Sequence, residues 1–202
     1  MKVTIITGSH RNDSQSEKTG RYIQKQILKL NLFKETYLLN LAHADIPYWD
    51  EDLKTMDKKW AHTWKPLEKE LISSDAFIIV TPEWNGMVPS KLKNLFLLPK
   101  ANVMGHKPAL IVAVSSGMGG SYPVIELRSS GYKNTRICYI PEHIIIRKIE
   151  EVLNEQPNDK NQSDLYIRQR IDYTLAMLQK YAEAFLQLRK SDFDFSKYPN
   201  GM

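Results

Sequence analysis

The sequence has a single cysteine, no internal repeat and no long apolar run, and each absence removes a class of protein. Cys138 alone cannot form an internal disulfide or build a thiolate metal cage. No apolar stretch approaches the roughly 18–20 residues that a membrane span needs. The opening MKVTIIT is too short an apolar stretch for a signal peptide, and no small-residue cleavage site follows it. We therefore expect a cytoplasmic protein without a membrane span.

Charge of one sign is in modest excess, with a formal net charge of +5 and a pI of about 9.1. A basic surface can bind a nucleic-acid backbone. However, the Lys and Arg residues are scattered and often stand beside acids, as in KPLEKE at 65–70. We therefore expect no nucleic-acid partner. The excess charge suits an anionic small molecule such as a phosphorylated nucleotide.

Strand-like apolar runs alternate with amphipathic stretches along the 202 residues, which is typical of parallel βαβ units. The predicted strands are 3–7, 35–41, 76–81, 109–115 and 136–140, and the predicted helices are 16–32, 60–73, 89–98, 121–130 and a long helix that follows a polar linker at 154–163 and ends near 190. Right-handed crossovers then give a doubly wound α/β sheet. We expect one domain over 1–190 and a tail over 191–202, which is either disordered or docked on a partner subunit.

The loop after the first strand, GSHRNDSQS at 8–16, has the composition of a phosphate cradle. Gly8 lets the backbone turn sharply, serine hydroxyls can donate to phosphate oxygens, and Arg11 supplies a charged fork. The helix that follows adds free N–H groups and a favourable dipole. The alternative is a serine-rich turn in which Ser14 or Ser16 caps the helix. The patterns G-x-G-x-x-G and G-x-x-x-x-G-K-[ST] are absent, which disfavours the sites that they build.

The loops after the third and fourth strands should reach the same edge of the sheet, where ligands bind in folds of this kind. Residues 81–94, TPEWNGMVPSKLKN, place an aromatic ring among polar and turn-forming residues, which suits a planar heterocycle. The alternative is a turn in which Asn85 and Gly86 supply left-handed geometry and Trp84 belongs to the core. The stretch SSGMGG at 115–120 could bring backbone N–H groups close to a ligand.

Together these motifs resemble the NADPH-dependent FMN reductase family, a flavodoxin-like group that includes quinone, chromate and azo-dye reductases. The family pattern G-S-x-R-x-x-S stands at 8–14, and T-P-E-Y-N-x-x-x-P-x-x-L-K-N stands at 81–94 with Trp84 in place of the usual Tyr. Three shorter matches are Lys107-Pro108, the Ser-x-Gly turn at Ser115, and Leu127-Arg128. The resemblance covers residues 2–150 and implies a five-stranded sheet in the order 2-1-3-4-5, here with a long C-terminal helix.

The resemblance implies bound FMN that takes a hydride from NADPH or NADH and passes electrons to a flavin, quinone, azo compound or similar acceptor, in a homodimer or homotetramer. Carried over to this chain, the FMN phosphate ligands are Ser9, Arg11, Ser14 and Ser16. The residues expected around the isoalloxazine ring are Pro82, Glu83, Trp84, Asn85, Gly86, Ser115 and Gly117. The flavin would carry the chemistry, so we predict no catalytic side chain and no metal.

Two other functions stay open on the sequence. A flavin-binding electron carrier or redox sensor would share the fold without oxidising NAD(P)H, although flavodoxin carriers are strongly acidic and lack the T-P-E-x-N motif. A nucleic-acid-binding domain would take up no flavin and would show steep salt dependence. The five histidines show no metal-ligand spacing.

Overall fold

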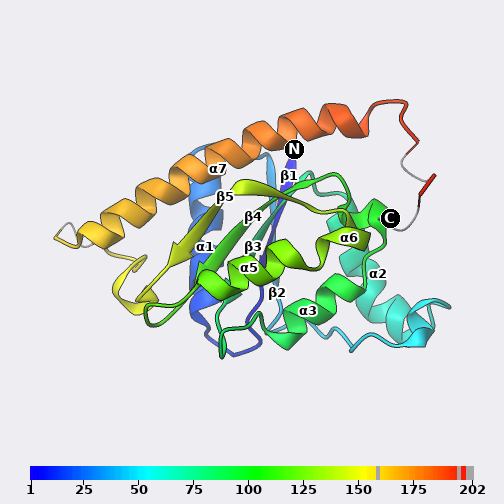
Figure 1. Cartoon of the computed structure of the whole chain (residues 1–202), viewed down its shortest axis with the longest axis horizontal. Coiled ribbons are helices and arrows are strands. Elements are labelled where there is room, and N and C mark those ends of the chain that lie inside the picture. The colour runs from blue at the N-terminus through cyan, green and yellow to red at the C-terminus, as the bar shows by residue number, and fades with distance from the viewer. Residues whose placement is uncertain (158–159, 195–196, 199–202) are drawn as a thin grey trace.

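Five parallel strands form one sheet in the order β2-β1-β3-β4-β5 (Figure 1). A computed structural model describes residues 1–157, 160–194 and 197–198. The strands are β1 (Lys2–Thr7), β2 (Glu35–Asn40), β3 (Ala76–Pro82), β4 (Pro108–Val114) and β5 (Cys138–Ile146). Strand order reverses between β1 and β3, which confirms the predicted doubly wound, flavodoxin-like fold and its strand order.

Helices cover both faces of the sheet (Figure 1). One face carries α1 (Gln15–Lys29) and the long α7 (Gln162–Arg189), which confirms the predicted C-terminal helix. The other helices are α2 (Lys58–Ile72), α3 (Ser90–Leu97), α4 (Ala101–Met104), α5 (Ser121–Ser129) and α6 (Tyr132–Thr135), and there are two 3-10 turns, η1 (Glu51–Leu53) and η2 (Ile149–Glu151). In the part of the chain that the structure describes, no helix combines the length and apolar character that a membrane crossing needs.

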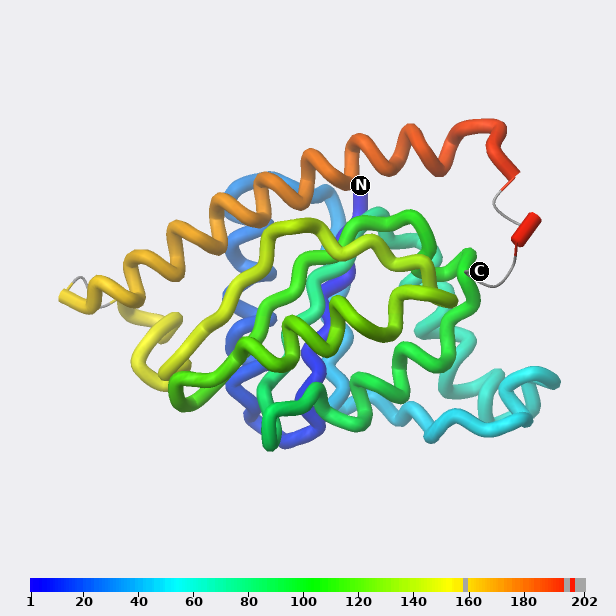
Figure 2. The backbone as a smooth tube through the Cα atoms, viewed as in Figure 1, coloured from blue at the N-terminus to red at the C-terminus, as the bar shows by residue number. Residues whose placement is uncertain are grey.

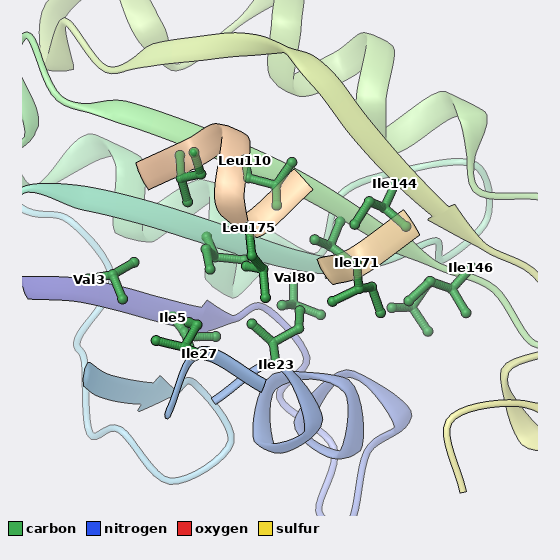
Figure 3. Close-up of a cluster of buried hydrophobic side chains, with 14 of the residues drawn as sticks. Val3, Ile5, Ile23, Ile27, Val80, Leu110, Ile144, Ile146, Ile171 and Leu175 are labelled. Carbon is green, nitrogen blue, oxygen red and sulfur yellow. The ribbon is translucent and has the colours of Figure 1, made fainter. Parts of the chain in front are cut away.

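The core consists of two apolar clusters, one on each face of the sheet. Figure 3 shows the first, where Ile5 and Val80 of the sheet meet Ile23 of α1 and Ile171 of α7. Apart from Lys2, the central strands β1, β3 and β4 are buried throughout, whereas the edge strands β2 and β5 are half-buried. This explains why the central strands read as continuous apolar runs in the sequence.

The fifth strand departs from the prediction. It was expected over 136–140, but it runs from Cys138 to Ile146. Pro141 has no N–H and polar residues follow it, so the sequence signal stops halfway along the strand. An edge strand tolerates this proline, and the pairing with β4 is irregular between Ala109 and Ile111. The predictions for the linker and the tail fall partly on 158–159, 195–196 and 199–202, which lie outside the described residues.

Lys107, part of the Lys-Pro motif just before β4, connects the sheet to α2 and α4 through its side chain. Its side chain is buried, and its Nζ donates to the carbonyls of Leu71, Ile72 and Val103 at 2.9, 2.8 and 2.7 Å. Two of these carbonyls belong to the last turn of α2, and that of Leu71 also accepts from the Ser74 N–H at 3.3 Å. Burial lowers the pKa of Lys107 to about 7, and the nearby Arg189 charge acts in the same direction.

We expect Lys107→Met to lower the free energy of unfolding by about 2–4 kcal/mol at pH 9, because the neutral amine present there still donates to two of the three carbonyls and methionine donates to none. The loss should be smaller at pH 6.5. Between pH 7 and about 10.4 the unfolded chain binds more protons at Lys107 than the folded chain does, so the contribution of Lys107 to stability rises with pH by up to about 1.4 kcal/mol per unit.

Urea unfolding of both proteins at the two pH values measures this difference. Lys100→Met, which changes an exposed lysine nearby, should leave stability within about 0.5 kcal/mol of the parent. An identical loss for Lys107→Met at both pH values would contradict the lowered pKa.

Candidate functional site

A cavity of about 270 Å³ lies at the carboxyl ends of β1, β3 and β4, where the three predicted loops converge. Of the residues predicted from the sequence, those that line it are Ser9, Arg11, Ser14, Ser16, Pro82, Glu83 and Trp84. Six further residues complete the lining: Asp13, Gln15, Val114, Ser116, Ile149 and Glu150. Among the described residues, no His, Cys or Lys belongs to this lining, so no imidazole, thiol or amine group stands beside its serine hydroxyls.

The first loop brings hydroxyl groups to the cavity together with two acceptors, the Asp13 carboxylate and the buried Gln15 Oε1, which is unpartnered within the described ranges. Ser14 is the N-cap of α1, and its Oγ accepts from the Glu17 N–H at 3.1 Å, which confirms the capping interpretation for Ser14. Ser16 is different, because its hydroxyl is buried and has no hydrogen-bond partner among the described residues. A buried hydroxyl without a partner carries a desolvation cost that an anionic ligand oxygen would remove. With the N–H groups of the first helical turn beside it, this cradle fits the phosphate of FMN.

Charge in the cavity is mixed. Arg11 is the one cation of the lining, and its backbone N–H donates to the Oγ of buried Ser9 at 3.2 Å. Asp13, in left-handed conformation with φ of 49°, and Glu150 bring exposed carboxylates to the same cavity. The half-buried Glu83 also lines the cavity, so Arg11 and the α1 amides must outweigh three carboxylates when a phosphate enters.

Trp84 forms the flat wall of the cavity. It is half-buried rather than a core residue, and the exposed His10 ring packs against it edge-on with 4.6 Å between ring centroids. A tight hairpin holds it, with Trp84 N–H donating to Met87 O at 3.0 Å and Met87 N–H donating to Trp84 O at 2.9 Å. Asn85 and Gly86 form the turn with φ of 48° and 73° and lie outside the cavity lining, so the turn interpretation is confirmed for this pair.

Glu83 couples the second loop to the third. Its backbone N–H donates to Val114 O at 3.0 Å, and its carboxylate accepts from the Gly120 N–H. A Cβ on Gly119 would lie 2.6 Å from Glu83 Oε1, so a side chain there would force the carboxylate to shift. The sequence predicts Glu83 as a neighbour of the flavin ring, and its carboxylate has this second, structural partner as well.

The third loop turns its serines in different directions. Ser116 lines the cavity, whereas Ser115 and Gly117 do not, and their contact with flavin stays a prediction. Ser115 Oγ instead accepts from the Gly117 N–H at 3.2 Å. Residues Ile149 and Glu150 reach the cavity from the loop after β5, which sequence reasoning missed because it ended the fifth strand six residues early.

The rest of the long motif anchors neighbouring segments. Asn94 donates to Pro47 O and accepts from the Trp49 N–H, both at 2.8 Å, and Lys91 Nζ donates to Ala44 O at 2.7 Å. These bonds fix the segment after β2. Arg128 lies outside the cavity lining and donates to two carbonyls of β5.

The model of NADPH-dependent FMN reductases matches residues 1–151, which is more than half of the chain and includes all three loops. The chain belongs to this family. The resemblance noted in the sequence is thereby confirmed, together with FMN as the cofactor and a nicotinamide nucleotide as the electron donor of the family.

Individual proteins agree with the assignment. A quinone reductase of Pseudomonas putida is 30% identical over 125 residues, which are 59% of this chain and 63% of that protein, less than two thirds of its length. A probable NADPH:quinone oxidoreductase 1 of Oryza sativa subsp. japonica is 29% identical over 164 residues, or 76% of this chain and 79% of that protein. The flavoenzyme NAD(P)H:(acceptor) oxidoreductase FerB of Paracoccus denitrificans shares the fold, with a TM-score of 0.68 at 21% identity over 91% of this chain and 98% of that chain.

We predict that Arg11→Ala weakens FMN binding by about 1.5–3 kcal/mol, because a charge-assisted contact is lost while Asp13 and Glu150 stay. Isothermal calorimetry on the FMN-free protein measures this change. Arg21→Ala, an exposed arginine on α1 outside the cavity, is the matched control and should bind FMN as the parent does. Equal losses in both variants would place the phosphate elsewhere.

We predict that Trp84→Phe keeps FMN binding but loses much of the quenching of tryptophan fluorescence that FMN causes. Trp60 and Trp64 are fully buried in the second core cluster, and Trp49 is outside the cavity lining, so Trp84 is the tryptophan placed to contact the ring. Steady-state emission during FMN titration tests this. An unchanged quench in the variant would remove Trp84 from the flavin site.

Proposed function

We propose that this chain is an FMN-dependent oxidoreductase that oxidises NAD(P)H and reduces a small acceptor such as a quinone, a free flavin or an azo compound. The observation that carries the proposal is the unpartnered Ser16 hydroxyl at the start of α1, in the same cavity as the flat wall of Trp84. A phosphate cradle joined to an aromatic wall is what a flavin mononucleotide requires. The quinone reductases among the relatives support a quinone as one acceptor.

In this proposal the residues of the first loop hold the phosphate end. The Ser9 and Ser16 hydroxyls donate hydrogen bonds to the phosphate, and Arg11 supplies positive charge. Ser14 caps α1, so that the amides of its first turn point to the ligand. Pro82 and Trp84 form a wall for the ring, and Asn85 and Gly86 set the angle of that wall through their turn. When bound, FMN supplies the redox chemistry itself.

The third loop acts through its backbone. The bond from Gly120 to Glu83 holds this loop against the second one, which positions its N–H groups before any ligand arrives. Donors fixed in advance stabilise developing negative charge better than donors that must reorganise. We propose this role for the segment 115–120, with Ser115 and Gly117 on the flank of the ring as the family pattern implies.

The competing function is an electron carrier or redox sensor that binds FMN without oxidising NAD(P)H. The net charge of +5 and the T-P-E-W-N motif favour the reductase. We also propose a cytoplasmic protein that forms a homodimer or homotetramer, which light scattering can measure directly.

We predict that NADPH or NADH bleaches the visible absorbance of the FMN-loaded protein under anaerobic conditions. Steady-state assays with a quinone should give parallel lines in double-reciprocal plots, because donor and acceptor would use one open face of the ring in turn. Anaerobic stopped-flow spectroscopy follows the bleaching, with dithionite as the control for a reducible flavin. If dithionite bleaches the flavin and neither nucleotide does, the carrier or sensor function replaces the reductase.

A further inference from the structure

A second cavity of about 540 Å³ lies beyond the third loop, between the end of β5, the segment 147–153 and the first turns of α7. Its floor is apolar and includes Ile146, Val152 and Ile167. Figure 2 shows the third loop and the segment 147–153 side by side at the same end of the molecule, next to the start of α7. The proposed flavin cavity uses none of these floor residues.

The third loop and the 3-10 turn η2 form a ridge between the two cavities. Ser116 lines the first cavity and Met118 lines the second. Gly117 stands between them, and a Cβ built there would meet no atom within 4 Å. An elongated ligand can therefore cross this ridge without displacing a side chain.

Two cations, Arg147 and Lys148, line the second cavity next to the third loop. Arg147 Nε donates to Met118 O at 2.7 Å, and its terminal amino groups have no partner in the ranges that the structure describes. The Lys148 side chain is more than half exposed, and within the described ranges its Nζ forms one ion pair, with Glu151 at 4.0 Å. A pair of this kind, with solvent around it, is worth little and gives way readily to a phosphate.

Tyr166 supplies an aromatic surface on the opposite rim. Its side chain is 65% exposed, and within the described residues its ring stacks on no other ring and receives no cation. An exposed aromatic ring over an apolar floor suits a purine base, which buries its faces and keeps its edges in water.

The segment that carries the two cations has a fixed shape. Lys148 and Leu153 both have left-handed backbone, with φ of 47° and 56°. The Lys148 N–H donates to Gly117 O at 3.0 Å, and the Leu153 N–H donates to the buried Asp164 carboxylate at 2.8 Å. Non-glycine residues in this region are held there by their surroundings and are frequent at ligand sites.

We propose that this second cavity binds the adenosine 2′-phosphate part of NADPH, with Arg147 and Lys148 on the phosphate and Tyr166 on the adenine, and that NADPH is therefore preferred over NADH. The inference rests on the proposed function, since it assumes that the nicotinamide end lies over the flavin cavity. It goes further by naming the donor and the residues that select it.

A rival groove exists on α1 and is less suited to a phosphate. It includes Lys18, Arg21 and Lys25. Lys18 Nζ already donates to Ile149 O and Asn154 Oδ1, and Arg21 is paired with Glu17. Two of the three cations therefore have partners, and the third loop does not line the groove.

The test uses adenosine 2′,5′-bisphosphate and ADP as probes, titrated into the FMN-loaded protein by calorimetry, so that binding is measured without turnover. We expect the bisphosphate to bind at least about tenfold more tightly than ADP. Lys148→Gln should abolish most of that preference and leave ADP within twofold, since the backbone bond to Gly117 survives the substitution. Tyr166→Ala should weaken both probes. Arg21→Gln with Lys25→Gln, the matched control in the rival groove, should change neither.

Stopped-flow reduction of the flavin gives the second measurement. Lys148→Gln should raise the apparent Kd for NADPH about tenfold and leave that for NADH unchanged. Equal affinity of the parent protein for both probes, or a preference lost in the rival-groove variant instead, overturns the proposal. If the bisphosphate binds tightly in a Lys148-dependent way while NADPH leaves the flavin oxidised, the site stands and the proposed function fails.

Discussion

Parallel pairing of β1, β3 and β4 places three carboxyl ends at one edge of the sheet, and everything at the site follows from that alignment. Residues Thr7, Val80 and Val112 are aligned across these strands, so the loops that follow them begin at nearly the same height. The sequence then decides what each loop does. The first ends in a capped helix, the second turns back in a two-residue hairpin, and the third bends over 116–118 in a glycine-rich stretch.

The site depends on contacts between loops as much as on their positions. The Glu83 carboxylate accepts from Gly120, and the left-handed Gly120 packs its Cα against Ile145 of β5, so a side chain there would meet Ile145 Cγ2 at 2.5 Å. The third loop is thus held by Glu83 on one side and by Ile145 on the other. Because it also separates the two cavities, a change at Glu83 would disturb both, whereas a change at Lys148 reaches only the second.

Residue pattern predicted most of this arrangement, and its failures have physical causes. Buried central strands can be recognised in the sequence as unbroken apolar runs. The 81–94 motif is long enough to indicate the family specifically. The predicted fifth strand is too short because a proline such as Pro141 is typical of a strand end. An edge strand tolerates proline, since it needs no N–H donor on its outer side. That error hid Ile149 and Glu150. The choice of Ser116 over Ser115 for the cavity depends on a hydrogen bond inside one turn, which no spacing rule predicts.

The two cavities differ in how their charges are distributed. A net charge of +5 suggested a general attraction for anions, yet the phosphate cradle has one arginine and two exposed carboxylates. Attraction there must come largely from oriented dipoles and hydroxyl donors beside Arg11, which act at hydrogen-bond distance and discriminate by geometry. Two exposed cations, Arg147 and Lys148, lie instead at the far side of Gly117, where charge acts over a longer range. In the proposed complex both environments are used at once. The phosphate of bound FMN would lie in the cradle of the first loop, and the 2′-phosphate of NADPH would lie beside the two cations of the second cavity.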